Sequence, residues 1–189
     1  GLTTQTNDSV SLRERNEMAG KKREVFVRCI QTCKLDKDDV YRMRKAVCSN
    51  ESFQIGYGGI CELLPPAFCS RSDCRAIFDL LKDGQESIDS RDLIMTFTNF
   101  VAGFDNEEKC KFAFDMYDVD HSGYLSLDEI EAMMMSTNLT TRDLIKKRAE
   151  NFMLCADTDR SGGITIDELV VAAEKLPNLL FPPQIKRKN

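Results

Sequence analysis

The chain has 189 residues, a formal net charge of −5 and a 42% share of hydrophobic residues, enough for one compact body or two small lobes. The acidic balance argues against a nucleic-acid binder, which usually presents a basic face. No apolar run approaches the ~20 residues of a transmembrane helix. The first residues show no signal-peptide pattern.

Residues 1–19 are polar and rich in Ser, Thr, Asn and Gln, so we expect a flexible arm there. Gly1 suggests N-myristoylation, but Gln5 stands where that motif favours Ser or Thr. The sequence therefore gives little support to a lipid anchor or to membrane association.

Residues 21–48 predict a helix in two pieces, with a break near Leu35–Asp36. A segment with several Gly and Ser residues follows over 49–62 and ends before Pro65–Pro66. We expect this segment to be a loop between two helices.

Ser70 and Asp73 resemble a helix start, and the helix runs toward Leu81. A second polar segment comes next, and an apolar helical pattern resumes after it. The apolar positions of these two helices are Ile77, Phe78, Leu80, Leu81, Leu93, Ile94, Phe97 and Phe100.

The second half shows the same alternation with stronger start signals. Asp105 and Glu108 are spaced as a capping box at the start of a helix. Thr140 or Thr141 caps a later helix, and Pro177 ends the last one.

Two twelve-residue segments, 118–129 and 157–168, carry oxygen-bearing residues at positions 1, 3, 5, 7, 9 and 12 and glycine at position 6. This is the pattern of a calcium-binding loop, because calcium takes six to eight oxygens and the chain must turn sharply at the glycine. The ligands predicted in the first loop are Asp118, Asp120, Ser122, the carbonyl of Tyr124, Ser126 and Glu129. Those predicted in the second loop are Asp157, Asp159, Ser161, the carbonyl of Gly163, Thr165 and Glu168.

Serine at position 5 leaves three carboxylates in each loop, whose charges roughly balance one Ca²⁺, so we expect two calcium ions per chain. The loop starts lie 39 residues apart (157 minus 118), which leaves room for a helix, a link and a second helix. We therefore expect the loops to lie side by side, with Leu125 and Ile164 in a short antiparallel contact. Amphipathic helical patterns flank both loops.

The first half holds degenerate versions of these loops. Residues 49–62 fall where a first loop is expected, but their register is ambiguous and no placement gives a full ligand set. Aligning Ile88 with position 8 of a second loop places Leu81 at position 1 and Asp92 at position 12. Asp83, Gln85 and Asp89 then remain as oxygen donors, so we predict a structural unit without an ion, with a weak site as the alternative.

These patterns are typical of four EF-hand units with an inactive front pair and a complete back pair. The stretch 111–126, K-F-A-F-D-M-Y-D-V-D-H-S-G-Y-L-S, is similar to the third EF-hand of calcineurin B-type proteins, as is Leu64–Pro65 after the first unit. Over roughly residues 60–176 the chain resembles the calcineurin B, neuronal calcium sensor and calcineurin-B-like group. The resemblance implies an all-α fold of four EF-hand units in two paired lobes, with short antiparallel β contacts between paired loops.

The resemblance has one departure and one alternative. In calcineurin B all four loops bind calcium, whereas the front pair here lacks its ligands. The EF-hand segment of calcium-regulated oxidases is also similar. The organisation that we predict is an arm at 1–19, a degenerate pair at 20–104, a calcium-binding pair at 105–176 and a tail at 177–189.

The tail is too apolar for an idle end, and we expect a plug or docking element rather than a solvated end. Its apolar residues are Leu179, Leu180, Phe181 and Ile185.

The chain has eight cysteines, no CxxC pair and one histidine, His121, which lies inside a predicted calcium loop. We expect buried, reduced thiols and a cytoplasmic location, ahead of a redox role or a zinc site. The cysteines are Cys29, Cys33, Cys48, Cys61, Cys69, Cys74, Cys110 and Cys155.

The function that these features favour is a calcium sensor or regulatory subunit that binds an amphipathic helix of a target protein in a calcium-modulated hydrophobic groove. Methionines would suit such a groove, or would simply fill the core; they are Met133, Met134, Met135 and Met153. The alternatives are a regulatory domain of a larger calcium-activated enzyme and a calcium buffer without a target. No catalytic motif is present, so we do not expect the chain to be an enzyme.

Overall fold

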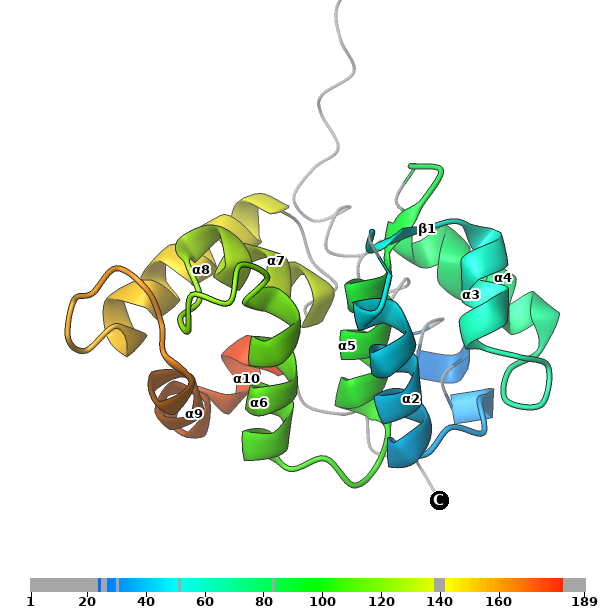
Figure 1. Ribbon diagram of the computed structural model, residues 1–189, viewed down its shortest axis with the longest axis horizontal. Coiled ribbons are helices and arrows are strands. Elements are labelled where there is room, and N and C mark those ends of the chain that lie inside the picture. Colours follow the sequence, from blue (N-terminus) through cyan, green and yellow to red (C-terminus); the bar gives the residue numbers. More distant parts are fainter. Residues whose placement is uncertain are drawn as a thin grey trace, which may run out of the picture.

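The computed structural model describes residues 24, 27–29, 31–50, 52–82, 84–137 and 142–181. The fold is all-α apart from two short strands, and the helices gather into two groups that lie side by side (Figure 1). The predicted fold class is therefore confirmed. Four predicted features lie outside the described residues: the arm at 1–19, Asp83, the caps Thr140 and Thr141, and Ile185 of the tail.

The front group holds two helix–loop–helix units, and the described residues between 24 and 32 are helical ahead of them. The first unit is α2 (Lys37–Cys48) and α3 (Tyr57–Leu63), and the second is α4 (Arg71–Leu81) and α5 (Ser90–Phe100). Asp36 caps α2 through a capping box with Asp39, and Ser70 caps α4 by accepting a hydrogen bond from Asp73 N. The break near Leu35–Asp36 and the helix start at Ser70 are thus confirmed.

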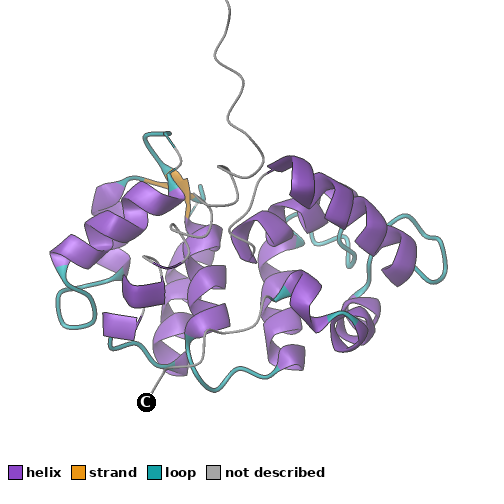
Figure 2. Ribbon diagram, turned by 180° about the vertical axis from the view of Figure 1, so that it is seen from behind, coloured by secondary structure: helices purple, strands orange, loops and turns teal. Residues whose placement is uncertain are grey.

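A two-stranded antiparallel ladder joins the two front loops. Strand β1 (Gln54–Ile55) pairs with β2 (Ile88–Asp89), with Ile55 opposite Ile88 and Gln54 opposite Asp89 (Figure 2).

The back group repeats this plan. Its units are α6 (Asn106–Tyr117) with α7 (Leu127–Thr137), and α8 (Arg142–Ala156) with α9 (Ile166–Lys175). The predicted capping box of Asp105 and Glu108 starts α6. The predicted contact between Leu125 and Ile164 is an isolated antiparallel bridge, with N···O distances of 2.8 and 2.9 Å.

The two groups pack against each other through α5 on α7 and through α2 beside α6. Thr96 Oγ1 of α5 donates to the carbonyl oxygen of Ser136 in α7 at 3.3 Å. On the other side, the rings of Tyr41 and Phe112 meet edge to face at 5.4 Å, and Arg44 pairs with Asp115 at 2.7 Å. The two lobes therefore share a continuous interior.

The apolar faces predicted around the back loops are buried. Met133 and Met134 lie fully inside the core, whereas Met135 and Met153 are only partly buried. For the first two methionines, the structure shows the core-filling alternative.

The start of the tail also enters the core. A short helix, α10 (Pro177–Leu180), follows α9 and packs on it, so Pro177 both ends the long helix and opens a new turn. Leu180 and Phe181 are only 1% and 5% exposed. Among the described residues, no helix is long and apolar enough to cross a membrane.

Candidate metal centres

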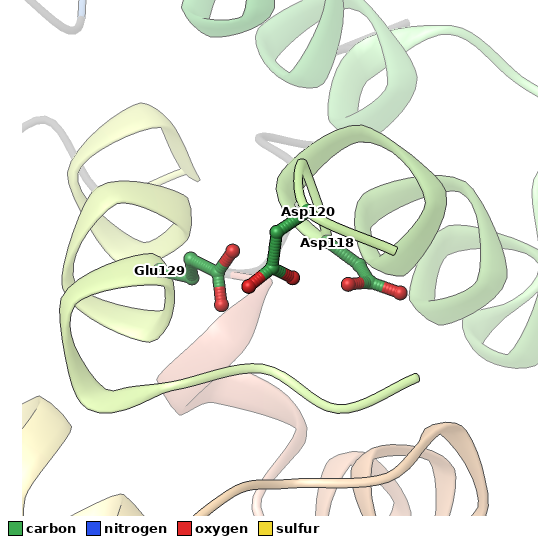
Figure 3. Close-up of side chains that lie close together, drawn as sticks. All are labelled: Asp118, Asp120 and Glu129. Atoms are coloured by element: carbon green, nitrogen blue, oxygen red, sulfur yellow. The ribbon is translucent and has the colours of Figure 1, made fainter. Parts of the chain in front are cut away.

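The first acidic centre lies at the junction of α6, the loop after it and α7. Carboxylate oxygens of Asp118, Asp120 and Glu129 all lie within 4.8 Å of one another. Figure 3 shows the carboxylates of Asp120 and Glu129 facing each other, with that of Asp118 beside them. Asp118 caps the end of α6 and is 7% exposed, whereas Asp120 is open to solvent.

Hydrogen bonds from the loop hold these carboxylates. The backbone N–H of Ser122 donates to Asp118 Oδ1 and Asp120 Oδ1 at 2.9 and 3.0 Å, and Gly123 N donates to Asp118 Oδ2 at 3.1 Å. Ser126 N and Oγ both donate to Glu129 Oε2 at 2.9 Å. The loop thus folds around its acidic side chains, so their repulsion is offset by hydrogen bonds to ionised oxygens.

The second centre has the same construction. One carboxylate oxygen from each of Asp157, Asp159 and Glu168 lies within 4.8 Å of the others. Ser161 N donates to Asp157 Oδ1 and Asp159 Oδ1 at 3.0 and 2.9 Å, as its counterpart does in the first loop. Thr165 N and Oγ1 donate to Glu168 Oε2 at 3.0 and 2.9 Å, which forms the capping box of α9.

The backbone of the two loops bends in the same way. His121 and Arg160, at position 4, adopt left-handed φ angles of 56° and 60°. Gly123 and Gly162, at position 6, have φ of 83° and 88°, a region that glycine enters without steric cost. The turn glycines therefore serve the role predicted for them.

The remaining predicted ligands lie in the same loops. Ser122 Oγ donates to the carbonyl oxygen of Tyr124 at 3.0 Å, and Ser161 Oγ donates to that of Gly163 at 3.1 Å. Both carbonyls at position 7 therefore point to the same side as the serine hydroxyl at position 5. The structure brings the twelve predicted residues into two oxygen-lined loops; their role as ligands is a proposal.

One neighbour of the second centre was missed in the sequence. Thr158 N and Oγ1 both donate to Glu168 Oε1 at 2.9 Å. Together with the bonds from Thr165, which have the largest effect, they lower the pKa of Glu168 to about 2. The signal in the sequence was a hydroxyl at position 2, where the first loop has Val119.

The loops also touch through their position-7 residues. The ring of Tyr124 covers Gly163 so closely that a Cβ on Gly163 would lie 2.3 Å from Tyr124 Cδ2. With the bridge between Leu125 and Ile164, this contact gives the two centres a direct mechanical link.

The bridges also fix the register of the front loops. Ile55 pairs with Ile88, as Leu125 pairs with Ile164, so Ile55 stands at position 8 of the first loop and Gly59 at position 12. The exiting helices then all begin at position 10; their first residues are Tyr57, Ser90, Leu127 and Ile166.

Position 12 is closed to a metal-binding carboxylate in the first front loop. A Cβ on Gly59 would lie 2.9 Å from Cβ of Ile55, an atom attached directly to the backbone. A glutamate side chain at this position would therefore have to displace the strand. The residue that must close a calcium loop has no room here.

In the second front loop, the acidic residues have other partners. Asp89 caps α5 by accepting from Arg91 N and forms a two-oxygen ion pair with the Arg91 guanidinium. Asp92, at position 12, accepts a long 3.5 Å hydrogen bond from Tyr117 of α6. Burial and the nearby Asp89 charge raise the pKa of Asp92 to about 7. Among the described residues, only the two back loops gather three or more potential metal ligands.

The donor chemistry of the back loops fits a hard cation. All predicted donors are carboxylate, hydroxyl or carbonyl oxygens, which Ca²⁺ prefers. A soft metal such as zinc would favour thiolate or imidazole, and neither is part of these clusters.

Comparison with known proteins supports this class of site. Residues 107–173 match the EF-hand domain pair family, which spans both back loops. The chain thus contains an EF-hand domain pair.

The relatives narrow the resemblance. The chain is 28% identical over 156 residues to the calcineurin B protein of Schizosaccharomyces pombe, a match that covers 80% of this chain and 89% of the relative. It is 31% identical over 103 residues to the human calcineurin B type 2 protein, covering 53% of this chain and 59% of the relative. For the Rattus norvegicus type 2 protein the values are 34% over 95 residues, 49% and 52%. The matches thus span only about half to three fifths of the two mammalian proteins, and the chain is an EF-hand protein that resembles the calcineurin B group.

Proposed function

We propose that this protein is a calcium-binding regulatory subunit that holds two Ca²⁺ ions, one in 118–129 and one in 157–168, and binds a helical segment of a partner protein. The observation that carries the proposal is the convergence of three carboxylates in each of two bridged loops. The names of the relatives, which are subunits of calcineurin, support a regulatory rather than an independent role.

Calcium binding can be transmitted from the loops to the helices. Glu129 and Glu168 lie in the first turns of α7 and α9, so a carboxylate that closes on an ion pulls on its own helix. Helix α7 packs on α5 of the front lobe, and α9 packs on α6 and α10. Movement of either helix therefore alters a surface away from the ion.

The front lobe would give the partner a constant contact. Its loops are paired by main-chain bonds and its acidic residues Asp89 and Asp92 are engaged by Arg91 and Tyr117. We expect partner affinity to rise with calcium without disappearing in its absence.

The tail is the element that a partner helix would compete with in the back lobe. Leu180 and Phe181 are buried, and Phe181 lies under the ammonium group of Lys109 at 5.9 Å. A partner helix with apolar side chains would compete with these two residues for the same lobe. Amide exchange at 179–181 should show protection that falls when a partner binds.

Calorimetry tests the ion sites directly. The parent should bind two calcium ions, whereas Glu129→Gln and Glu168→Gln should each lose one, because each removes an oxygen of the closing carboxylate. Asp128→Asn and Asp167→Asn are matched controls, since they remove one charge from exposed neighbours of the same residues. The ligand assignment is wrong if the control variants lose an ion and the glutamate variants do not.

Two further measurements separate a regulator from a buffer. A regulator should expose apolar surface with calcium, seen as increased fluorescence of a hydrophobic dye, whereas a buffer EF-hand barely opens. The affinity for a purified partner should be higher in calcium than in chelator. Equal affinity in both conditions would reduce calcium to a structural role.

A further inference from the structure

The front lobe contains a group of buried thiols that the proposed calcium chemistry does not use. Four cysteines are buried at the junction of the first helical segment and α4: Cys29, Cys33, Cys69 and Cys74. Cys33 Sγ lies 2.9 Å from Cys69 Sγ, well inside ordinary contact distance for two sulfur atoms.

The backbone holds these two sulfur atoms together. Lys34 N, next to Cys33, donates to the carbonyl oxygen of Phe68, next to Cys69, at 2.8 Å. Thr32 Oγ1 donates to Asp73 Oδ2 at 3.0 Å and so joins the same two segments. Two hydrogen bonds on either side of the thiols therefore fix their approach, and no backbone movement is needed to bring them closer.

A pair of thiols, rather than a metal site, is what the geometry favours. Among the described residues, no group of three thiols or other ligand atoms comes together here as the carboxylates do in the back loops. A structural zinc site needs four ligands in tetrahedral array. Two sulfur atoms in contact instead match the requirement of a disulfide.

We propose that Cys33 and Cys69 form a reversible disulfide that locks the segment 27–33 onto the start of α4 under oxidising conditions. The oxidant is a peroxide, which is small enough to reach Cys33 at 9% exposure, whereas Cys69 is 2% exposed. Peroxide oxygen is transferred to the sulfur of Cys33 to give a sulfenic acid, and the O–O bond breaks with release of water. The sulfur of Cys69 then displaces the hydroxyl group as a second water, so two thiols and one H₂O₂ give one disulfide and two waters.

The surroundings decide the order of these steps. The hydrogen bond with Cys33, followed by burial, raises the pKa of Cys69 far above its usual value, so Cys69 remains a thiol until its partner is oxidised. Burial also raises the pKa of Cys74 to about 12, which makes it a poor competitor for the same sulfenic acid. Oxidation should therefore be slow and should give one specific pair.

Peptide mapping of the full chain tests the proposal. The reduced protein is treated with hydrogen peroxide, remaining thiols are blocked with an alkylating reagent, and non-reduced peptides are analysed by mass spectrometry. A peptide that links Cys33 to Cys69 and disappears after dithiothreitol is the expected result. A link between Cys69 and Cys74, or sulfinic acid at Cys33 without any link, would overturn the proposal.

Stability gives a second measurement. The link joins residues 36 positions apart. Oxidation should therefore raise Tm by roughly 5–10 °C, because the closed loop restricts the unfolded chain. Cys33→Ser and Cys69→Ser should abolish this rise, and Cys48→Ser and Cys155→Ser, which change exposed cysteines, should retain it. A rise that persists in Cys69→Ser would contradict the assignment. Calcium stoichiometry should be equal in the reduced and oxidised protein, which separates this test from that of the calcium sites.

Discussion

The front and back lobes have the same loop pairing but different loop chemistry. In both, residues at position 8 form an antiparallel bridge, Ile55 with Ile88 in front and Leu125 with Ile164 behind. The back loops gather three carboxylates each. In the front lobe, position 12 is either the glycine Gly59 or a carboxyl group turned toward Tyr117.

The difference separates what builds the fold from what binds the ion. Main-chain bonds and buried apolar residues maintain the paired loops in both lobes, and these do not depend on acidic residues. The ion chemistry depends on a few side chains that can be lost while the scaffold remains. A lobe without ligands can then serve as a fixed support for one that responds to calcium.

The largest effect should come from forcing the front lobe toward the back one. Gly59→Glu supplies the missing position-12 carboxylate, but its Cβ would meet Ile55. We expect no third calcium ion and a loss of stability of roughly 2–3 kcal/mol, the usual range for overpacking.

The control for this variant is Gly58→Glu. A Cβ on Gly58 meets no atom within 4 Å, and the residue lies in the same helix, so charge and helix propensity change equally. Urea unfolding and calorimetry measure both variants. Equal stability of the two would show that position 12 is not sterically closed.

Asp92 offers a smaller effect that depends on pH. Its pKa is raised to about 7 in the folded chain, so the folded state binds this proton more tightly than the unfolded state does. The stability that this proton gives is complete below about pH 4 and is lost as pH rises through about 7. Asp92→Asn should therefore gain roughly 1–2 kcal/mol over the parent at pH 8 and less at pH 5.5.

Thermal unfolding at the two pH values checks this prediction. Asp38→Asn is the matched control, since Asp38 is an exposed carboxylate in the first turn of α2. A gain for Asp92→Asn that is equal at both pH values, or a loss at pH 8, would contradict the proposed burial of charge.

The link between the back loops should show a still smaller effect. Gly163→Ala places a Cβ against the ring of Tyr124, which is 48% exposed and can swing outward. We expect a cost of about 1 kcal/mol, at the low end for overpacking, which disappears when Tyr124 is also changed to Ala. A double-mutant cycle measured by urea unfolding gives this coupling, and additive effects would mean that the contact carries none.

The smallest effect concerns the difference between the two back loops. The hydroxyl and N–H of Thr158 donate to Glu168 Oε1, an oxygen that a calcium ion would also use. Thr158→Val removes the hydroxyl, and we expect the second site to bind calcium about 2–3-fold more tightly, equivalent to roughly 0.5 kcal/mol. Val119→Thr is the reciprocal change and should weaken the first site by a similar factor. Effects of opposite sign in calorimetry would show that the hydroxyl assists closure.

The sequence was sufficient wherever a strong local signal existed. The capping box of Asp105, the helix start at Ser70 and the bridge of Leu125 with Ile164 were all predicted and are confirmed. These features depend on spacing along the chain, which a single sequence displays directly.

Features that depend on three-dimensional packing were not predictable. The first front loop has no ligand to reveal its register, which became clear only when Ile55 was found opposite Ile88. The contact of Cys33 with Cys69 arises from a fold that brings together residues 36 positions apart. Burial of Met133 and Met134 was one of two alternatives, because an apolar helix face suits both a core and a groove.

The central claim is that calcium binds the back pair alone while the front pair keeps the same architecture without it. An anomalous difference map from crystals grown with calcium tests this most directly. The account predicts two peaks, one among Asp118, Asp120 and Glu129 and the other among Asp157, Asp159 and Glu168. A peak beside Asp89 in the front lobe, or the absence of a peak from either back loop, would contradict it.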